Sequence, residues 1–290
     1  MSAPPAPDVS VVIPVRNGAC HLDEQLRALA VQSLRDPWEL LVVDNGSTDG
    51  TRELVFKWSG RLPIRLIDAA DHQGVNATRN RGAQAARAPL LAFCDADDRV
   101  EPGWLEALAE AMIHYRIVGG RLDERTLNTT SPHRPAHPSD RLPVALGFLP
   151  FAPGANLGIR RDTLIELGGF DERFVLGFDD AELSIRAQLK GIAIGYAPAA
   201  GVAYRHREHP RALFDQFRSY GRGEVLLYRI YRDFGIERPR MGMAARRWSS
   251  LASQAPLALR ARTRPRSWLY RAGYSLGRVE GSIRHHTLYL

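Results

Sequence analysis

The sequence has little of several features that would mark particular protein classes. Its 290 residues include two cysteines, too few for a disulfide framework or a cysteine zinc site. No apolar run approaches the roughly 18 residues that a membrane-spanning helix needs. The first residues also lack the basic and then apolar pattern of a secretion signal. With 44% hydrophobic and 24% charged residues, the chain has an ordinary globular composition, and we expect it in the cytoplasm.

Lysine is also scarce, because the 39 basic residues comprise two lysines and 37 arginines. The net charge of +7 is distributed unevenly. From Arg205 to the C-terminus, 18 arginines are accompanied by 6 acidic residues, so the positive charge belongs to the last part of the chain. A basic region attracts phosphates, acidic lipid surfaces or nucleic acid, and charge alone does not choose among them.

The first hundred residues alternate short apolar runs with amphipathic stretches. This pattern is typical of an open, mostly parallel α/β sheet. It predicts strands at residues 9–15, 39–44, 64–68 and 90–95, and helices at 21–32, 51–58 and 76–86. Ligands of such sheets bind beyond the carboxyl ends of the strands, where Asp44 and Asp95 lie.

The alternation weakens after Asp98. We expect helices at 101–115, 161–167 and 181–190, and strands at 117–119 and 192–196, with helix dominating from residue 211. A loop dense in Pro, Ser and His, at 128–143, is expected to be either mobile or a lid.

Three carboxylates follow the predicted strand that ends at Asp95. Alternate residues of an extended segment project to the same side, so Asp95 and Asp97 could share one hard cation such as magnesium or manganese. The alternative is an acidic turn that caps the next helix.

Asp44 ends a second predicted strand and is followed by Asn45, Gly46 and Ser47. A carboxylate at this edge can accept hydrogen bonds from a nucleoside, as acidic residues do in dinucleotide folds. The residues after it also suit a plain turn and a helix N-cap, and both interpretations remain open.

Together these segments resemble the family 2 glycosyltransferases of the GT-A fold. The likeness extends over about residues 9–231 and is carried by the order and spacing of seven strings: VSVVIPVRN, LLVVDNGSTDGT, ATRNRG, FCDADD, GAN, GGFDE and FDDAELSIR. The resemblance implies a GT-A catalytic domain at 1–206, with a nucleotide-binding half (1–100) and an acceptor-binding half (101–206). A basic helical region, 207–290, follows it.

The resemblance also implies roles in donor binding. The donor nucleotide would be held by Pro14, Val15, Arg16, Asn17, Asp44, Arg79 and Asp95. The divalent cation, Mn²⁺ or Mg²⁺, would be bound by Asp97, Asp95 and His206. One departure is Asn45, because many members of the family have a second acid at that position.

The family's catalytic base lies in an acidic pair that opens a helix, which matches Asp179 and Asp180. We expect Asp180 to take the proton of the acceptor hydroxyl, with Asp179 and Asn156 near the donor sugar. Direct displacement of this kind inverts the anomeric centre. Asp180 as a helix cap and Asn156 in a glycine turn are the structural alternatives.

The sequence therefore predicts an inverting, metal-dependent hexosyl transfer from a nucleotide sugar, expected to be a UDP-sugar, to a hydroxyl of a glycan, lipid-linked or natural-product acceptor. The alternatives are a sugar nucleotidyltransferase and a non-catalytic scaffold that binds nucleotide sugars. The basic tail fits a solvated face, a peripheral contact with the inner membrane surface or an acceptor lid. A nucleic-acid partner is not expected, because no recognition motif accompanies the charge.

Overall fold

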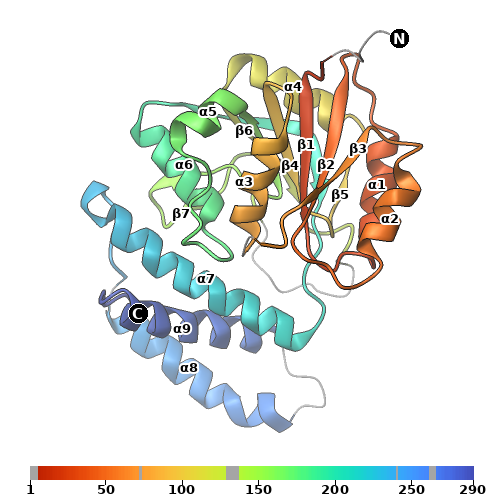
Figure 1. Ribbon diagram of the computed structural model, residues 1–290. Helices are drawn as coiled ribbons and strands as arrows, with labels where there is room; N and C mark the ends of the chain where they lie inside the picture. The colour runs from red at the N-terminus through yellow and green to blue at the C-terminus, as the bar shows by residue number, and fades with distance from the viewer. Residues whose placement is uncertain (1–5, 72–73, 129–136, 240, 261–265) are drawn as a thin grey trace, which may run out of the picture.

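The computed structural model describes residues 6–71, 74–128, 137–239, 241–260 and 266–290. One large twisted sheet has helices on both faces, and three long C-terminal helices pack together beside it (Figure 1). The strand order in this eight-stranded sheet is β3-β2-β1-β4-β9-β6-β10-β5. The α/β sheet with a helical C-terminal extension agrees with the fold class predicted from the sequence.

The first four strands pair in parallel and match the predicted ranges within one residue at either end. They are β1 (Val9–Val15), β2 (Trp38–Asp44), β3 (Ile64–Asp68) and β4 (Leu90–Cys94). Every residue of β1 is buried, because a central strand of a parallel sheet is covered by helices on both faces. Parallel pairing brings the carboxyl ends of β1, β2 and β4 to one edge, where the acidic residues lie.

Two hydrophobic clusters fill the layers on either side of the sheet. One joins the sheet to α1 (Leu22–Ala30), α2 (Thr51–Trp58) and α4 (Trp104–His114). The other joins it to α3 (Val75–Ala85), α5 (Arg161–Leu167) and α6 (Asp179–Leu189). The predicted helices thus form the two outer layers, and α6 begins two residues before its predicted start.

The second half of the sheet departs from the predictions. Strand β9 (Asn156–Arg160) was not predicted, yet it runs antiparallel between β4 and β6 (Ile117–Asp123). Its sequence, Asn-Leu-Gly-Ile-Arg, gives a weak local signal, because an interior glycine lowers strand propensity. Strand β9 forms because it is hydrogen-bonded to a neighbouring strand on each edge, and this pairing compensates for its low local strand propensity.

The remaining strands also reflect pairing over long sequence distances. Strand β10 (Ile194–Ala203) and β6 are longer than predicted, because they pair with each other in parallel. Strand β5 (Arg99–Val100) pairs with the end of β10, and β7 (Val144–Ala145) pairs with β8 (Leu149–Pro150). Of the expected lid, residues 129–136 lie outside the described residues.

The C-terminal helices are α7 (Pro210–Tyr231), α8 (Met241–Arg260) and α9 (Arg266–Arg284), with a short 3₁₀ turn, η1 (Arg232–Phe234), after α7. Helices α7 and α9 lie side by side (Figure 1). Three glycines of α9, at positions 273, 277 and 281, face α7 closely, and a Cβ at Gly277 would lie 2.0 Å from the carbonyl oxygen of Arg218. Such close approach of two backbones requires residues without side chains.

Helix α7 also contacts the sheet half of the chain. Leu226, Leu227 and Tyr231 share one buried cluster with Phe174 and Ile185. Within the described part of the chain, no helix combines the length and the apolar character needed to cross a membrane.

Candidate active site

A cavity of about 1640 Å³ lies between the carboxyl ends of the central strands, the start of α6 and the C-terminal helices. Nine of the residues expected in the site line it: Pro14, Val15, Arg16, Asn17, Arg79, Asp95, Asp97, Asp179 and Asp180. The tertiary structure therefore brings residues from four separate sequence segments to one cavity. Asp44, Asn156 and His206 are not among its lining residues.

The loops after β1 and β2 are tied together at this cavity. The backbone N–H of Asn17 donates to Oγ of Ser47 (2.9 Å), and the N–H of Thr48 donates to Oδ1 of Asn17 (2.8 Å). Asn17 has a φ of 54°, a left-handed conformation that asparagine tolerates better than most residues. This conformation allows the loop after β1 to fold back toward the loop after β2.

Arg79 connects the two acidic groups of the cavity. Its guanidinium donates to Oδ1 of Asp95 (3.0 Å) and to Oδ2 of Asp179 (2.7 Å). The side chains of Arg79 and Asp179 are each 6% exposed, so this pair is almost fully removed from water. Burial raises the pKa of Asp179 to about 6, while the charge of Arg79 opposes that rise.

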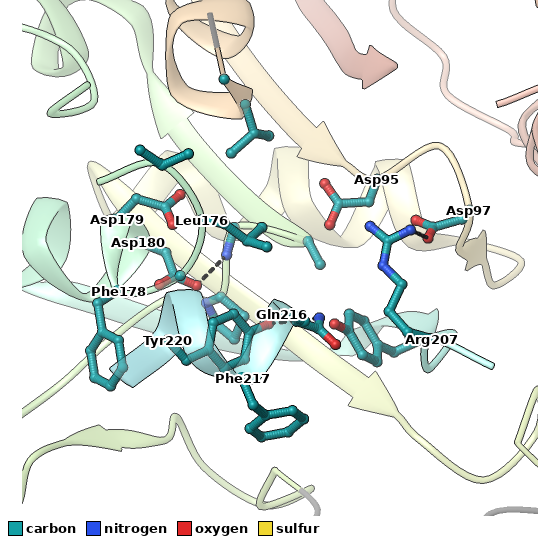
Figure 2. Close-up of a pocket in the computed structure, with 18 of the residues that line it drawn as sticks. Asp95, Asp97, Leu176, Phe178, Asp179, Asp180, Arg207, Gln216, Phe217 and Tyr220 are labelled. Atoms are coloured by element: carbon teal, nitrogen blue, oxygen red, sulfur yellow. Dashed lines mark hydrogen bonds and ion pairs between the residues drawn. The ribbon is translucent and has the colours of Figure 1, made fainter. Parts of the chain in front are cut away.

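Asp180 lies beside this pair, at the first turn of α6. Its Oδ2 accepts a hydrogen bond from the backbone N–H of Gly154 (2.9 Å), and its Oδ1 accepts one from Ala181 (2.8 Å). The preceding Phe178 has a φ of 67°, which is unusual for a bulky residue. The turn aims the acidic pair into the cavity, opposite Asp95 and Asp97 (Figure 2).

Asp97 faces a cationic side chain, Arg207, with Nη1 of Arg207 3.5 Å from its Oδ2. Burial raises the pKa of Asp97, Arg207 opposes this effect, and Asp95 adds to it. The neighbouring Asp98 is fully buried and accepts a hydrogen bond from the N–H of Arg205 (2.7 Å). Asp98 therefore supports the loop, while Asp95 and Asp97 face the cavity.

These two carboxylates suit a divalent cation, because Mg²⁺ and Mn²⁺ prefer oxygen ligands and such sites commonly combine one or two carboxylates with substrate phosphates. The guanidinium against Asp97 already places a positive charge there. Among the described residues, no group of three His, Cys, Asp or Glu side chains is arranged to hold a metal alone. The donor set therefore fits a cation that is also bound by a ligand.

The structure does not place His206 with these carboxylates. Its Nε2 lies 3.3 Å from Oε2 of Glu124, whose other oxygen contacts His137. The His206 side chain is 8% exposed and does not line the cavity. In this conformation the ring of His206 contacts Glu124, and its expected role as a metal ligand stays a prediction.

Asn156 also lies away from the cavity lining, and its expected sugar contact stays a prediction. Its side chain is fully buried, its Oδ1 accepts from the indole N–H of Trp104 (2.8 Å), and its Nδ2 donates to two backbone carbonyls, those of Arg121 (2.9 Å) and Ala200 (2.8 Å). Both amide hydrogens are used, so no donor remains for a sugar in this conformation. Asn156 instead joins β9, β6, β10 and α4.

Asp44 is buried under the turn that follows β2. Its Oδ1 accepts from the N–H of Ser47 (3.0 Å), and Nε of Arg52 lies 3.1 Å from its Oδ2. In this conformation Asp44 shapes the turn. Contact between Asp44 and a nucleoside stays a prediction.

Several lining residues come from the basic tail and were not identified from the sequence. Gln216, Phe217 and Tyr220 of α7 line the cavity, and Figure 2 shows Tyr220 on the side of Asp180, with the Phe217 ring directed away from the acidic pair. A Cβ at Gly177 would lie 2.2 Å from Cδ1 of Tyr220, so α7 packs directly on the turn before Asp179. The sequence signal was the interleaving of tyrosine with arginine, which carries no information on what the helices contact.

Comparison with known families and proteins agrees with this geometry. The model of glycosyl transferase family 2 matches residues 10–168, and that of glycosyl transferase family group 2 matches residues 90–279. The chain is 28% identical over 232 residues to glycosyltransferase AglE of Haloferax volcanii, covering 78% of this chain and 76% of AglE. It is 31% identical over 233 residues to the pre-mycofactocin glycosyltransferase of Mycobacterium tuberculosis, covering 76% of this chain but only 47% of that protein.

Solved structures share the fold at low sequence identity. TarS 1–349 of S. aureus, in complex with UDP-GlcNAc, has a TM-score of 0.56 at 19% identity, covering 98% of this chain and 93% of the other. The mannosyltransferase PcManGT from Pyrobaculum calidifontis, in complex with GDP-Man and Mn²⁺, has a TM-score of 0.61 at 20% identity, covering 95% and 87%. The resemblance expected from the sequence motifs is confirmed by the match to the family model: with this GT-A fold, the chain belongs to glycosyltransferase family 2 and is an enzyme of that class.

Proposed function

We propose that the protein transfers a sugar from a nucleoside diphosphate donor, a UDP-sugar, to an acceptor hydroxyl, with inversion at the anomeric carbon and with a divalent cation. The observation that carries the proposal is the pairing of two acidic groups across one cavity. Asp95 and Asp97 follow β4, Asp179 and Asp180 open α6, and Arg79 links the two sides.

The donor belongs on the β4 side of the cavity. Asp95 and Asp97 would hold a cation, which when bound would neutralise charge on the departing diphosphate. The backbone of residues 14–17 and the side chain of Arg79 line the same side. Two fold neighbours contain UDP-GlcNAc and GDP-Man, the second with Mn²⁺, which supports a nucleotide-sugar donor.

The acceptor hydroxyl belongs beside Asp180. The Gly154 N–H and the start of α6 orient this carboxylate. It takes the hydroxyl proton as the acceptor oxygen bonds to the anomeric carbon, and the bond from that carbon to the diphosphate oxygen breaks. One direct displacement inverts the configuration and needs no covalent sugar intermediate.

The two alternatives predicted from the sequence receive less support. A non-catalytic scaffold is set aside because the chain belongs to a family of enzymes. A sugar nucleotidyltransferase would be expected to have a glycine-rich, lysine-bearing loop after the first strand, and the segment from Pro14 to Gly18 has no lysine.

Calorimetric titration with UDP, GDP and dTDP, each with and without MnCl₂, tests the donor and cation together. We expect one nucleotide, UDP, to bind at least tenfold more tightly with the metal, because its phosphates complete the coordination that two carboxylates begin. Asp97→Ala should remove this metal dependence, and Asp140→Ala, an exposed carboxylate outside the cavity, is the matched control.

If the nucleotide binds equally well without metal, the proposed need for a cation is wrong. If no nucleotide binds, the proposed donor site is wrong. The stereochemistry is checked separately by NMR of the first product formed from an α-linked donor. Retention of the α configuration would rule out direct displacement with Asp180 as the base.

A further inference from the structure

The C-terminal helices form one wall of the cavity, and its chemistry differs from that of the β4 side. Arg246 and Arg247 of α8 and Arg271 of α9 line this wall, together with Tyr270 and Tyr274. The cavity is therefore acidic where the strands end and basic where the tail closes it. A cavity with one acidic and one basic side can bind two chemically different groups, one on each side.

Tail arginines that hold the helices together are paired with carboxylates. Arg278 binds Glu224 between α9 and α7, and Arg218 binds Glu280 in the same interface. These pairs account for their charges structurally. They explain part of the arginine content of the tail without a ligand.

Arg278 also lines the cavity, but three other lining arginines of the tail, Arg246, Arg247 and Arg271, have no carboxylate partner among the described residues. Neither Arg246 nor Arg247 forms an ion pair with a carboxylate in the described ranges, and Nη2 of Arg247 is buried with no hydrogen-bond partner there. Arg271 donates only to neutral oxygens, Oε1 of Gln254 and the carbonyl of Ser267. A buried donor without a partner is costly, and Nη2 of Arg247 is such a donor. Arg246 is exposed and Arg271 has neutral partners, so all three guanidinium groups can bind an anion from outside the described chain.

Aromatic rings lie next to these arginines. Phe217 of α7 packs against Tyr270 and Tyr274 of α9, with ring centroids 5.3 and 6.3 Å apart. Tyr220 joins the same group and lies against Gly177, two residues before Asp179. The basic wall is thus continuous with the surface beside the acidic pair.

We propose that this wall is the acceptor site and that the acceptor carries a phosphate or phosphodiester group, bound by Arg246, Arg247 and Arg271. The inference rests on the function proposed above and names the acceptor class. Phosphate is favoured because the planar guanidinium donates two parallel hydrogen bonds to its oxygens. The phosphate could belong to a lipid carrier or to a water-soluble phosphorylated saccharide.

The test uses the full chain saturated with its nucleoside diphosphate and Mn²⁺, so that the donor site is already filled. Inorganic phosphate, glucose 6-phosphate and octyl phosphate are then titrated, with glucose and octyl glucoside as neutral counterparts. We expect glucose 6-phosphate to bind at least tenfold more tightly than glucose, and octyl phosphate at least tenfold more tightly than octyl glucoside.

Arg246→Gln combined with Arg247→Gln should weaken phosphate binding about tenfold or more, and the corresponding double Lys variant should retain most of it. Arg284→Gln removes the same charge from an exposed part of α9 that does not line the cavity, and should bind like the native chain. Circular dichroism melting of each variant separates lost binding from lost folding.

Equal phosphate affinity in the native chain and in a folded Gln double variant would overturn the proposal, as would equal affinity for charged and neutral probes. Tighter binding of octyl phosphate supports a lipid-linked acceptor, and equal or tighter binding of glucose 6-phosphate supports a water-soluble one. Failure of every nucleotide to bind would refute the proposed function instead, and the phosphate titration on the nucleotide-free protein would still test the basic wall.

Discussion

Among the single residues that the structure describes in the site, Arg79 is the one that connects its acidic groups. One guanidinium contacts two carboxylates that are 84 positions apart in the chain, Asp95 and Asp179. Burying three charges costs free energy unless each is well paired. The cost is offset here by two short ion pairs and by the Phe170 ring, whose centroid lies 5.6 Å from the guanidinium carbon. Asp180 is left next to this group, with its two oxygens bound only by backbone N–H groups in the described structure.

Replacing Asp180 with Asn should lower kcat for transfer by about 10²- to 10⁴-fold, the usual contribution of a general base. The amide oxygen keeps the hydrogen bond from Gly154, so nucleotide affinity should change little. Steady-state kinetics with the native donor measures the effect. Asp233→Asn, at a carboxylate that is 84% exposed, is the control, and more than a tenth of native activity in Asp180→Asn would exclude Asp180 as the base.

The raised pKa of Asp179 predicts a specific dependence of stability on pH. The native side chain has a pKa of about 6, against an ordinary value of 3.8. Between these values the native state holds a proton that the unfolded state has lost, so this contribution to stability is full below pH 4 and disappears as pH rises to 6. Its size is about 2–3 kcal/mol.

Urea unfolding of the native chain and of Asp179→Asn at pH 4, 5, 6 and 7 tests this. The native chain should lose stability relative to the variant between pH 4 and 6, and the difference should then stay constant. A difference that is constant from pH 4 to 7 would mean that Asp179 ionises at its ordinary pKa.

At the scale of elements, the α7–α9 pair depends on glycine. Gly273, Gly277 and Gly281 are four residues apart, so they lie along one face of α9, and a Cβ at any of them would come within 3.0 Å of atoms on α7. The helices approach each other at their backbones, which holds the arginines and tyrosines of α9 against the cavity. The position of the basic wall therefore depends on the close packing of α9 against α7.

Gly277→Ala should destabilise the protein by about 1–3 kcal/mol, the usual cost of an added methyl group in a packed interface. The new Cβ would meet the carbonyl of Arg218 at 2.0 Å, and backbone cannot turn aside as a side chain can. Gly242→Ala on α8 has nothing within 4 Å and should be neutral or slightly stabilising. Denaturant unfolding compares the two, and equal stabilities would show that α7 and α9 are not closely packed.

At the scale of the whole molecule, the sheet half and the tail share buried surface. Leu226, Leu227 and Tyr231 of α7 pack with Phe174 and Ile185, and the hydroxyl of Tyr231 donates to Oε1 of Glu182 on α6 (2.8 Å). A chain ending at residue 206 would expose this apolar cluster to water. The catalytic domain and helical region predicted from the sequence are thus joined by a common core.

We therefore expect the full chain to unfold in a single cooperative transition, and residues 1–206 alone to lack stable tertiary structure. Differential scanning calorimetry of the full chain, and near-ultraviolet circular dichroism of the shorter one, measure these outcomes. Two separate transitions, or a native-like near-ultraviolet spectrum of residues 1–206, would show that the two parts fold independently.

The features of the fold that depend on local residue patterns could be predicted from the sequence. Apolar runs ending in Asp44 and at Asp95 predicted the parallel strands and the edge where ligands bind. This was possible because the periodicity of a strand and the position of its end can be recognised from neighbouring residues alone. Asp95 and Asp97 were expected at that edge because they follow a parallel strand, whereas Asp180 was assigned to the same site through the resemblance to family 2 glycosyltransferases. Nine of the expected site residues do line the cavity.

Which polar groups remain available at that cavity depends on contacts between residues that are distant in the sequence. Asn156 lies in an unpredicted antiparallel strand, and its side chain is hydrogen-bonded to residues of β6, β10 and α4. The ring of His206 contacts Glu124. The tail forms a wall of the cavity because glycines of α9 admit α7 and because α7 packs on the turn before Asp179. Each of these outcomes depends on partners distant in the sequence, and no local pattern of charge or hydrophobicity specifies which distant group a side chain meets.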